Sequence, residues 1–568
     1  MTTEQKAVRR PRIGFDPWVF GITAAIVVSF VVWGMVDSDS LNASSTNALG
    51  WITDNMGWLF ILSATFFVVF AVYLAASKYG RIPLGHDGDK PEYRTISWIA
   101  MMFSAGMGIG LMFFGAYEPL FHFVNAPPGY DARDVQIAMA TTMFHWGFHP
   151  WAMYAVVGLA IAYSTYRCGR GQLISAVFAP LLGGRENGPI GKVIDILAIF
   201  ATLFGTVASL GLGALQIGSG LVKVGWVDEP STMLLVAVIA VLTAAFVASA
   251  VSGIARGIQW LSNINMVLAL ILAIFVFVVG PTVFILNLMP TTLGAYLNDI
   301  PSFSARSGAT VDADGQDWLA SWTIFYWAWW VSWTPFVGLF LAKISKGRTI
   351  REFVIGVMVV PTTVSLVWFC IFGGTAIRQE TDGLNLPVDD SEATLFEVLA
   401  HLPWTAVASA LVMLLVAIFF VSGADSASIV MGSLSHRGAH DPPRWLTIFW
   451  GVLTGTVAAL LLAISGDDGL TGLQQMAIIA ALPFVVVMIL MCFALFRDLR
   501  RDPLIVARME LRSEIDEHIR QQATEIATSE FSAVGGYVEE PVSVDEPLNP
   551  NSEARSADAT GQERSHLP

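Results

Sequence analysis

Residues 323–348 read TIFYWAWWVSWTPFVGLFLAKISKGR, a long apolar run that ends in three basic residues. About 20 apolar residues suffice for a transmembrane helix, and Lys and Arg gather at the cytoplasmic ends of such helices. The sequence therefore predicts an all-α integral membrane protein. We predict twelve transmembrane helices, at 17–36, 57–77, 95–117, 138–165, 193–222, 232–252, 262–289, 318–342, 352–377, 404–434, 445–464 and 472–496.

The composition excludes an ordinary soluble enzyme. Of 568 residues, 55% are hydrophobic and 13% charged, whereas soluble domains are about 25% charged. Three cysteines are too few for a disulfide framework or a zinc site. The net charge is −14, and residues 498–568 contribute −8 of it through 15 acidic and 7 basic residues. Because no basic patch is interleaved with aromatic residues, the sequence does not support nucleic-acid binding.

Loop charges predict the orientation. If both termini are cytoplasmic, the six outside loops hold few cations, namely Arg133, Lys223, Arg306 and Arg378. This alternation supports twelve spans in the cell membrane, surrounded by lipid. Apolar residues at helical spacing predict an extracytoplasmic amphipathic helix in 290–317. In the tail, 503–528 is predicted to be a mixed-charge helix, and the acidic residues after it are predicted to be disordered.

Glycines interrupt the third predicted span. The motif Ser104-Ala105-Gly106-Met107-Gly108-Ile109-Gly110 has three glycines at alternate positions, each costing about 1 kcal/mol in a helix relative to alanine. Small residues of this kind often permit close helix packing. Alternatively, the segment is unwound, and its free N–H groups meet an anionic group of a ligand.

Two aromatic clusters lie deep in predicted spans. They comprise Trp329, Trp330 and Trp333 in one span and Trp146, Trp151 and Tyr154 in another. Aromatic stripes are usually packing residues, but two clusters at this depth favour a binding box. Indole faces attract quaternary ammonium groups, and these motifs contain no carboxylate that a Lys-like ammonium would need. With an anion site at the glycines, the pattern predicts a small zwitterionic substrate that joins a methylated amine to a carboxylate.

Polar residues inside other spans are further candidates. Thr202, Thr206 and Ser209 share a helix face; they either bond to their own helix carbonyls or contribute to a sodium site. Asp425, deep in an apolar run, is a functional candidate or a helix-junction residue. His145 and His149 are spaced as a metal pair, but without the Glu of HExxH we interpret them as polar packing. We predict no catalytic residues, no cofactor and no metal other than sodium.

At these motifs the sequence resembles the betaine/carnitine/choline transporter family, and within it the sodium-coupled glycine betaine carriers. The resemblance covers residues from about Phe15 to Phe496. It is densest in GMGIGLMFFGAYEPL (106–120), TTMFHWGFHPWAMYAVVGLAIAYSTYR (141–167), DILAIFATLFGTVASLGLGALQIG (195–218), the stretch 323–348 and FFVSGADSASIVMG (419–432).

The resemblance implies a LeuT-like fold with two inverted five-helix repeats and two extra N-terminal helices, assembled as a homotrimer. The implied segments are a cytoplasmic N-terminal segment 1–16, two peripheral helices in 17–77, a first repeat 95–289, the extracytoplasmic helix 290–317, a second repeat 318–497 and a cytoplasmic tail 498–568.

The resemblance also implies roles for single residues. The six clustered aromatics would hold the substrate ammonium, Phe340 would gate the pathway, and the backbone around Ala105–Gly108 would meet the substrate carboxylate. Gly110 stands where choline-selective members carry an acidic residue. One sodium ion would bind at Ser104, Met107, Phe419, Ser422 and Gly423, and a second at Thr202, Thr206 and Phe336. Gly423 departs from the serine of the betaine carriers, and Ser104 replaces their alanine.

Together these features predict a secondary active transporter that imports glycine betaine, or a related compatible solute, with sodium for osmotic protection. Ectoine and proline are alternative substrates. Proton coupling, antiport and a non-transporting osmosensor are alternative mechanisms. Sequence alone leaves the preferred solute, the affinity, the ion stoichiometry, sodium binding at Gly423 and osmosensing by the acidic tail open.

Overall fold

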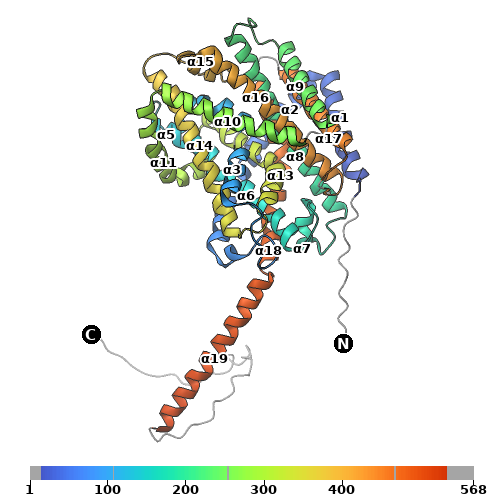
Figure 1. The fold of residues 1–568 in the computed structure, drawn as a ribbon, viewed down its shortest axis with the longest axis vertical. Coiled ribbons are helices and arrows are strands. Elements are labelled where there is room, and N and C mark those ends of the chain that lie inside the picture. Colours follow the sequence, from blue (N-terminus) through green and yellow to red (C-terminus); the bar gives the residue numbers. More distant parts are fainter. Residues whose placement is uncertain (1–13, 107, 253–254, 440, 466–468, 534–568) are drawn as a thin grey trace, which may run out of the picture. The chain divides into compact units, whose positions relative to one another are not determined.

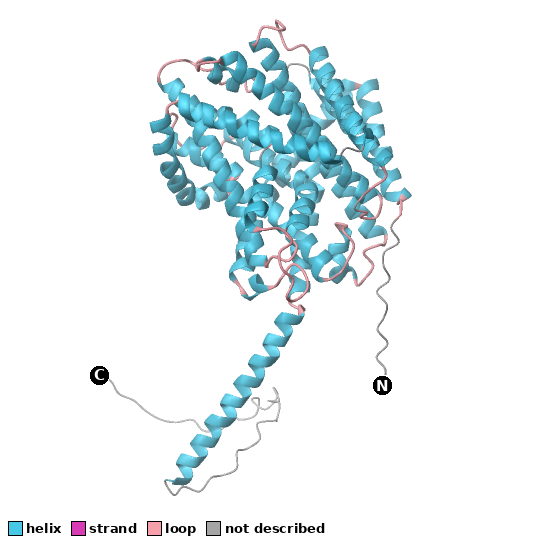
Figure 2. Ribbon diagram, viewed as in Figure 1, coloured by secondary structure: helices cyan, strands magenta, loops and turns pink. Residues whose placement is uncertain are grey.

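The computed structural model describes residues 14–106, 108–252, 255–439, 441–465 and 469–533. Within these ranges the regular elements are helices, and the only β-pairing is an isolated bridge between Pro83 and Thr349 (Figure 2). The chain divides into two units, residues 1–502 and 503–568. The predicted all-α class is therefore confirmed for the described residues.

Most predicted spans coincide with one continuous helix. Asp16 caps the first helix by accepting bonds from Trp18 and Val19 N–H. The second helix begins at Ser38 rather than at 57, where Asp37 caps it by accepting a bond from the N–H of Ser40. The first half of this helix is polar, so a search for apolar runs does not detect it. The continuous helices are α1 (Pro17–Val36), α2 (Ser38–Ala76), α8 (Pro189–Lys223), α9 (Thr232–Ser252), α14 (Ile350–Thr381), α16 (Thr405–Ser435), α17 (Arg444–Ser465) and α18 (Gly469–Leu499).

The third and fourth predicted spans are each split into two helices. The third consists of α3 (Thr95–Gly106) and α4 (Ile109–Val124). The fourth consists of α5 (Val135–Trp146) and α6 (Phe148–Ala162), interrupted at Gly147 and followed by a π-helical turn, Tyr163–Arg167. At this second break the hydroxyl of Tyr296 accepts a hydrogen bond from the Phe148 N–H at 2.8 Å, so a side chain from another helix satisfies the freed backbone group.

The seventh predicted span ends earlier than expected. Helix α10 (Ala255–Val279) is followed at Gly280 and Pro281 by a bend of 110° into α11 (Thr282–Ala305). The helix expected in 290–317 is therefore α11, which begins at Thr282. Proline cannot continue the α10 ladder because it has no N–H, and it serves instead as the N-cap of α11. The loop predicted at 378–403 also contains a short helix, α15 (Thr394–Ala400).

Nine described helices are long and apolar enough to cross a membrane, or ten if α10 and α11 form one bent span. The remaining two predicted spans are the split pairs, so the count of twelve stays a prediction. Helix α8 is 83% buried along its most apolar window, whereas α1 is 33% and α9 17% buried. Helix α8 thus lies near the centre of the first unit and α1 at its periphery (Figure 1).

The eighth predicted span is a continuous run of α12 (Ala313–Leu319), a π-helical turn (Ala320–Ile324) and α13 (Phe325–Ile344). Helix α13 packs against α6, α8 and α18. Its contact with α6 brings the two aromatic clusters of the sequence to one interface. That interface positions the candidate site described below.

The tail begins with a helix that forms a separate unit. The predicted helix 503–528 is α19 (Pro503–Ala533), and its described side chains are exposed apart from that of Ile505, which is buried. Residues 498–502 belong to the first unit, where Arg170 pairs with Asp498 and Arg167 pairs with Asp502. The first compact unit therefore ends at Asp502, and the predicted tail boundary at 498 stays a prediction. The predicted disordered segment beyond 533 and the N-terminal residues 1–13 lie outside the described residues.

Candidate substrate and ion site

All six aromatic residues predicted to form a binding box line one cavity, here called the cage cavity. They come from α5, α6 and α13; five are buried, and Trp333 is partly exposed. The cavity volume is about 50 Å³. The remaining lining residues are Gly108, Ile109, Gly110, Leu111, Pro150, Ser209 and Ser365. The structure thus brings together the six rings that the family resemblance implies for one cage.

The indole rings form a corner. Trp329 and Trp330 stack at 4.9 Å between ring centroids, with an angle of 17° between their planes. Trp146 stands nearly perpendicular to both, at 4.9 Å and 78° to Trp330 and at 6.2 Å and 90° to Trp329. Tyr154 is 6.2 Å from Trp330 at 81°. A corner of this kind presents the edge and faces of several rings to one small volume.

The N–H groups of the three indoles on α13 are bonded to protein atoms. Trp330 donates to the carbonyl of His145 at 2.9 Å, and Trp333 donates to the carbonyl of Gly205 at 2.8 Å. Trp329 donates to the hydroxyl of Ser209 at 3.2 Å. Because these donors are satisfied by protein groups, the rings offer π faces rather than hydrogen bonds to a guest. Such a surface suits a cation that itself donates no hydrogen bonds.

Gly110 allows the rings to meet. A Cβ atom at this position would lie 2.6 Å from Cη2 of Trp329 and 2.8 Å from Cη2 of Trp146. Both distances are shorter than van der Waals contact, so any side chain here displaces at least one ring. The packing of the cage therefore leaves no room for an acidic side chain at position 110.

The break between α3 and α4 opens onto the cage cavity. Gly108 is extended (φ −163°, ψ −178°) and precedes α4 without a side-chain cap. Among the described residues, the first N–H groups of α4 therefore have no intrahelical or side-chain acceptor, an arrangement that attracts anions. Gly108 and Ile109 line the cavity. Ala105 and Gly106 belong to the end of α3; their side chains, that of Ser104, and all of Met107 lie outside the described residues.

A second cavity, here called the ion cavity, adjoins the first. It has a volume of about 180 Å³ and shares Gly108, Ile109, Ser209 and Trp333 with the cage cavity. Among the residues predicted for gating and sodium binding, it brings together Phe340, Thr206, Phe336, Phe419, Ser422 and Gly423. Residues expected at two separate ion sites thus meet around one space.

The hydroxyl groups near the ion cavity also bond to their own helices. Thr206 donates to the carbonyl of Thr202 at 2.7 Å, and Ser422 donates to the carbonyl of Phe419 at 3.3 Å. Each hydroxyl oxygen retains acceptor capacity for a cation. Thr202 is buried and donates to Ala198 at 2.8 Å, but it is not among the residues that line this cavity.

The family model for "BCCT, betaine/carnitine/choline family transporter" matches residues 18–504 of this chain. The chain belongs to this family. BCCT proteins are transporters and not enzymes, and the protein is accordingly a multi-pass membrane transporter. The predicted resemblance is thus confirmed.

Several named relatives are similar over most of the BCCT chain. The betaine/ectoine transporter LcoP of Corynebacterium glutamicum is 41% identical over 97% of this chain and 86% of its own length. The glycine betaine transporter OpuD of Bacillus subtilis is 45% identical over 85% of this chain and 94% of its own length. Glycine betaine transporter 1 of Vibrio parahaemolyticus is 41% identical over 86% of this chain and 95% of its own length.

A solved structure of a sodium-coupled sialic acid symporter, substrate-bound and outward-open, matches 77% of this chain and 86% of that chain. Its TM-score is 0.39 and its sequence identity 15%. This score is too low to establish a shared fold, so the inverted repeat of this BCCT chain stays a prediction.

Asp425 was singled out in the sequence, but the structure does not bring it to either cavity. It is buried in α16, one turn beyond Ser422, while its neighbour Ser426 faces the ion cavity. Ser209, in contrast, lines both cavities and holds the indole of Trp329. Of these two candidates, only Ser209 touches the site.

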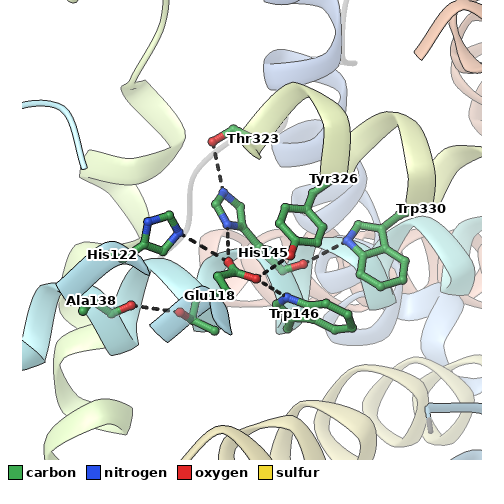
Figure 3. Close-up of polar contacts among 9 residues, drawn as sticks. Glu118, His122, Ala138, His145, Trp146, Thr323, Tyr326 and Trp330 are labelled. Atoms are coloured by element: carbon green, nitrogen blue, oxygen red, sulfur yellow. Dashed lines mark hydrogen bonds and ion pairs between the residues drawn. The ribbon is translucent and has the colours of Figure 1, made fainter. Parts of the chain in front are cut away.

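Sequence reasoning missed Glu118, a fully buried carboxylate behind the cage (Figure 3). Its Oε2 accepts a hydrogen bond from Nε1 of Trp146 at 2.7 Å. The aromatic motifs themselves contain no carboxylate, but the fold places that of Glu118 against one of their rings. The predicted third span ended at 117, which made Glu118 a loop residue, whereas α4 continues to Val124. The rule that a carboxylate inside a span is a functional candidate would have identified Glu118 had the helix end been placed correctly.

Proposed function

We propose that this BCCT transporter imports glycine betaine, or a closely related zwitterionic compatible solute, together with sodium. The observation that carries the proposal is a single cavity with indole faces on one side and an uncapped helix start on the other. The rings attract a methylated ammonium, and the helix start attracts a carboxylate. Import across the plasma membrane, both termini in the cytoplasm, osmotic protection and a homotrimer are part of this proposal.

The relatives support betaine and keep ectoine as the second candidate. Three of them carry betaine in their names, and one is named for both betaine and ectoine. Ectoine is also a zwitterion, but its cationic end carries N–H groups. In the cage those donors would face ring surfaces rather than oxygen atoms. We therefore favour betaine as the better substrate, and ectoine and proline as weaker ones.

Sodium coupling is supported by the oxygen atoms around the ion cavity. Several uncharged oxygens lie near the start of α4, where the third span is broken. They are the hydroxyl oxygens of Thr206, Ser209 and Ser422. Uncharged oxygens of this kind coordinate sodium in transporters with discontinuous helices. Proton coupling or antiport with the same substrate is the alternative mechanism.

Replacing Thr206 with alanine tests the ion cavity. We expect Thr206→Ala to raise the sodium concentration for half-maximal betaine uptake about fivefold, which corresponds to the loss of about 1 kcal/mol from one ligand. Thr454→Ala is the matched control, because Thr454 is also buried and also bonds to its own helix, at Trp450, but lines neither cavity. An unchanged sodium dependence in Thr206→Ala would remove this residue from the site.

Adding a hydroxyl at Gly423 should have the opposite effect. A Cβ atom at Gly423 would meet no heavy atom within 4 Å, and the residue lines the ion cavity. A serine therefore fits and supplies one more oxygen, so we expect Gly423→Ser to lower the half-maximal sodium concentration about fivefold. Gly294→Ser, a helical glycine with equally open surroundings on α11, is the control. A Gly423→Ser variant with the sodium dependence of the parent would contradict ion binding at this position.

Uptake of labelled glycine betaine into vesicles tests the proposed function. We expect uptake that requires a sodium gradient, disappears when potassium replaces sodium, and is weakly inhibited by ectoine. Uptake that follows a proton gradient without sodium would establish the alternative coupling. Stronger inhibition by ectoine than by unlabelled betaine would reverse the substrate order, and betaine binding without any uptake would indicate a sensor.

A further inference from the structure

A buried carboxylate stands directly behind the cage. Glu118 lies in α4 with a fully buried side chain. Its Oε2 accepts hydrogen bonds from Nε1 of Trp146 at 2.7 Å and from the hydroxyl of Tyr326 at 2.5 Å. Its Oε1 is 2.8 Å from Nδ1 of His145, as Figure 3 shows. Three donors from two helices, α5 and α13, thus converge on one carboxylate of α4, as expected for its ionised form.

The tautomer of His145 follows from its two partners. If Nδ1–H donates to Glu118, Nε2 accepts from the hydroxyl of Thr323 at 3.0 Å, and every polar atom of this group is satisfied. His145 is then neutral, like Trp146 and Tyr326. Among the residues that the structure describes, no lysine or arginine forms an ion pair with Glu118. The cluster therefore carries one uncompensated negative charge in the interior, which is costly.

His122 is placed to supply the missing charge. It is one turn after Glu118 on the same helix, and its Nε2 lies 3.5 Å from Oε1 of the carboxylate. The ring is buried, and within the described residues neither of its nitrogens has a hydrogen-bond partner. One proton on His122 would create a buried ion pair with Glu118 and give Nε2 an acceptor. Without that proton the carboxylate stays unbalanced.

We propose that His122 and Glu118 form a proton-binding site whose occupancy sets the charge behind the substrate cage. The empty site carries one negative charge, and the occupied site is neutral. The site extends the proposed function and rests on it, because its effect is read through substrate binding. It is connected to the cage by the hydrogen bond from Trp146 and by His145, whose ring bonds to Glu118 and whose carbonyl accepts from Trp330, and it needs no contact with the substrate.

A proton fits this cluster better than a metal ion does. Ligand atoms of Glu118, His122 and His145 lie within 4.8 Å of one another, close enough to share a metal. However, all three side chains are fully buried, and none of them lines the cage cavity or the ion cavity. A hydrated metal ion needs an entry path, whereas a proton can pass between hydrogen-bonding groups.

A third cavity lies close to His122. The ring of His122 is 5.4 Å from that of Trp318, centroid to centroid. Trp318 lines an open cavity of about 840 Å³ together with Asp312 and Asp314. The indole N–H of Trp318 is buried and lacks a hydrogen-bond partner in the described part of the chain. Only one ring therefore separates His122 from a cavity that contains acidic side chains.

Other charged and titratable groups surround His122. Arg306 is held against the ring faces of Tyr130, Phe303 and Trp318, and its charge opposes a proton on His122. The carboxylate of Glu118, 3.5 Å from Nε2 of the imidazole, favours that proton. The remaining groups nearby are His145 on α5, His149 on α6, Tyr326 on α13 and Tyr117 on α4.

The charge of the site changes how strongly the cage binds a cation. The empty site places a negative charge one indole ring away from a bound ammonium, in a medium with little screening, and so strengthens its binding. The occupied site removes this attraction. Betaine affinity should therefore fall as the pH falls, by about 5- to 10-fold between about pH 8 and pH 5, the range typical of coupled sites.

The experiment measures betaine binding by the purified full-length protein over this pH range, in parent, His122→Gln and His149→Gln forms. Glutamine cannot take up the proton, so His122→Gln should keep the high affinity of the alkaline form at every pH. His149→Gln is the matched control: His149 is an equally buried histidine that stacks on Trp327 but has no carboxylate partner, and its variant should retain the pH dependence of the parent. A His122→Gln protein with the parent's pH dependence overturns the proposal.

A measurement on the parent protein does not depend on any variant folding. Because coupling is reciprocal, adding betaine near the midpoint of the pH dependence should release protons into a weakly buffered solution. Betaine binding without proton release, at an affinity independent of pH, overturns the proton site but leaves the proposed function intact. No betaine binding at any pH overturns the proposed function itself. One equivalent of tightly bound zinc in the purified protein would assign the cluster to a metal instead.

Discussion

Trp330→Leu is expected to reduce uptake of low concentrations of glycine betaine to background. Trp330 is the ring that touches most of the cage: it stacks on Trp329 and meets Trp146 and Tyr154 at near-right angles. Leucine fills part of the volume but has no π face. Losing a desolvated cation–π contact of about 2 kcal/mol lowers affinity about 30-fold.

The control for this variant lies on the same helix. Trp327→Leu also removes a buried indole from α13, but Trp327 packs against Phe144 and His149 and lines neither cavity. We expect it to lower the amount of folded protein while leaving the half-saturating betaine concentration unchanged. Both variants are compared at equal amounts in the membrane. Equal uptake by Trp330→Leu and the parent would remove this ring from the substrate site.

Gly110→Ala is expected to reduce betaine uptake at least about tenfold through a single added methyl group. The methyl carbon would lie 2.6 Å and 2.8 Å from ring atoms of Trp329 and Trp146. Because both rings are buried and their N–H groups are bonded to protein, neither can retreat without breaking a hydrogen bond. Overpacking of this kind destabilises a packed interior by about 1–3 kcal/mol. Here the rings of the cage must shift to relieve it, so substrate binding is weakened.

The same substitution at Gly294 separates the steric effect from a general effect of replacing a helical glycine. A Cβ at Gly294 meets nothing within 4 Å, so Gly294→Ala should transport like the parent. A Gly110→Ala protein with normal uptake and affinity would show that the rings do not define the site as the structure places them.

The cage could be predicted from sequence because its parts follow simple spacing rules. Trp329 and Trp333 are four residues apart and share a helix face, and Trp151 and Tyr154 are three apart. These rings also lie far from the ends of their apolar runs, which distinguishes them from the aromatic residues that commonly lie at the membrane interface. The glycine motif gave a break in the third span as one of two interpretations for a similarly local reason, since alternate glycines weaken a helix wherever they occur.

Other features depend on contacts between distant segments and could not be derived this way. The break at Gly147 is stabilised by the hydroxyl of Tyr296, which belongs to another helix. The bend at Gly280 and Pro281 divides an apolar run that reads as one span. The role of Glu118 depends on donors 28 and 208 residues away in the chain, at Trp146 and Tyr326. Hydropathy and periodicity carry no information about such pairs.

The measurement that tests the central claim most directly compares glycine betaine with 3,3-dimethylbutyrate, in which carbon replaces the quaternary nitrogen. The two compounds have the same shape and the same carboxylate, and they differ only in the positive charge that the indole faces would recognise. We predict that the purified protein binds betaine at least about tenfold more tightly, as expected for a desolvated cation–π site. Equal affinity for the two compounds would contradict the account.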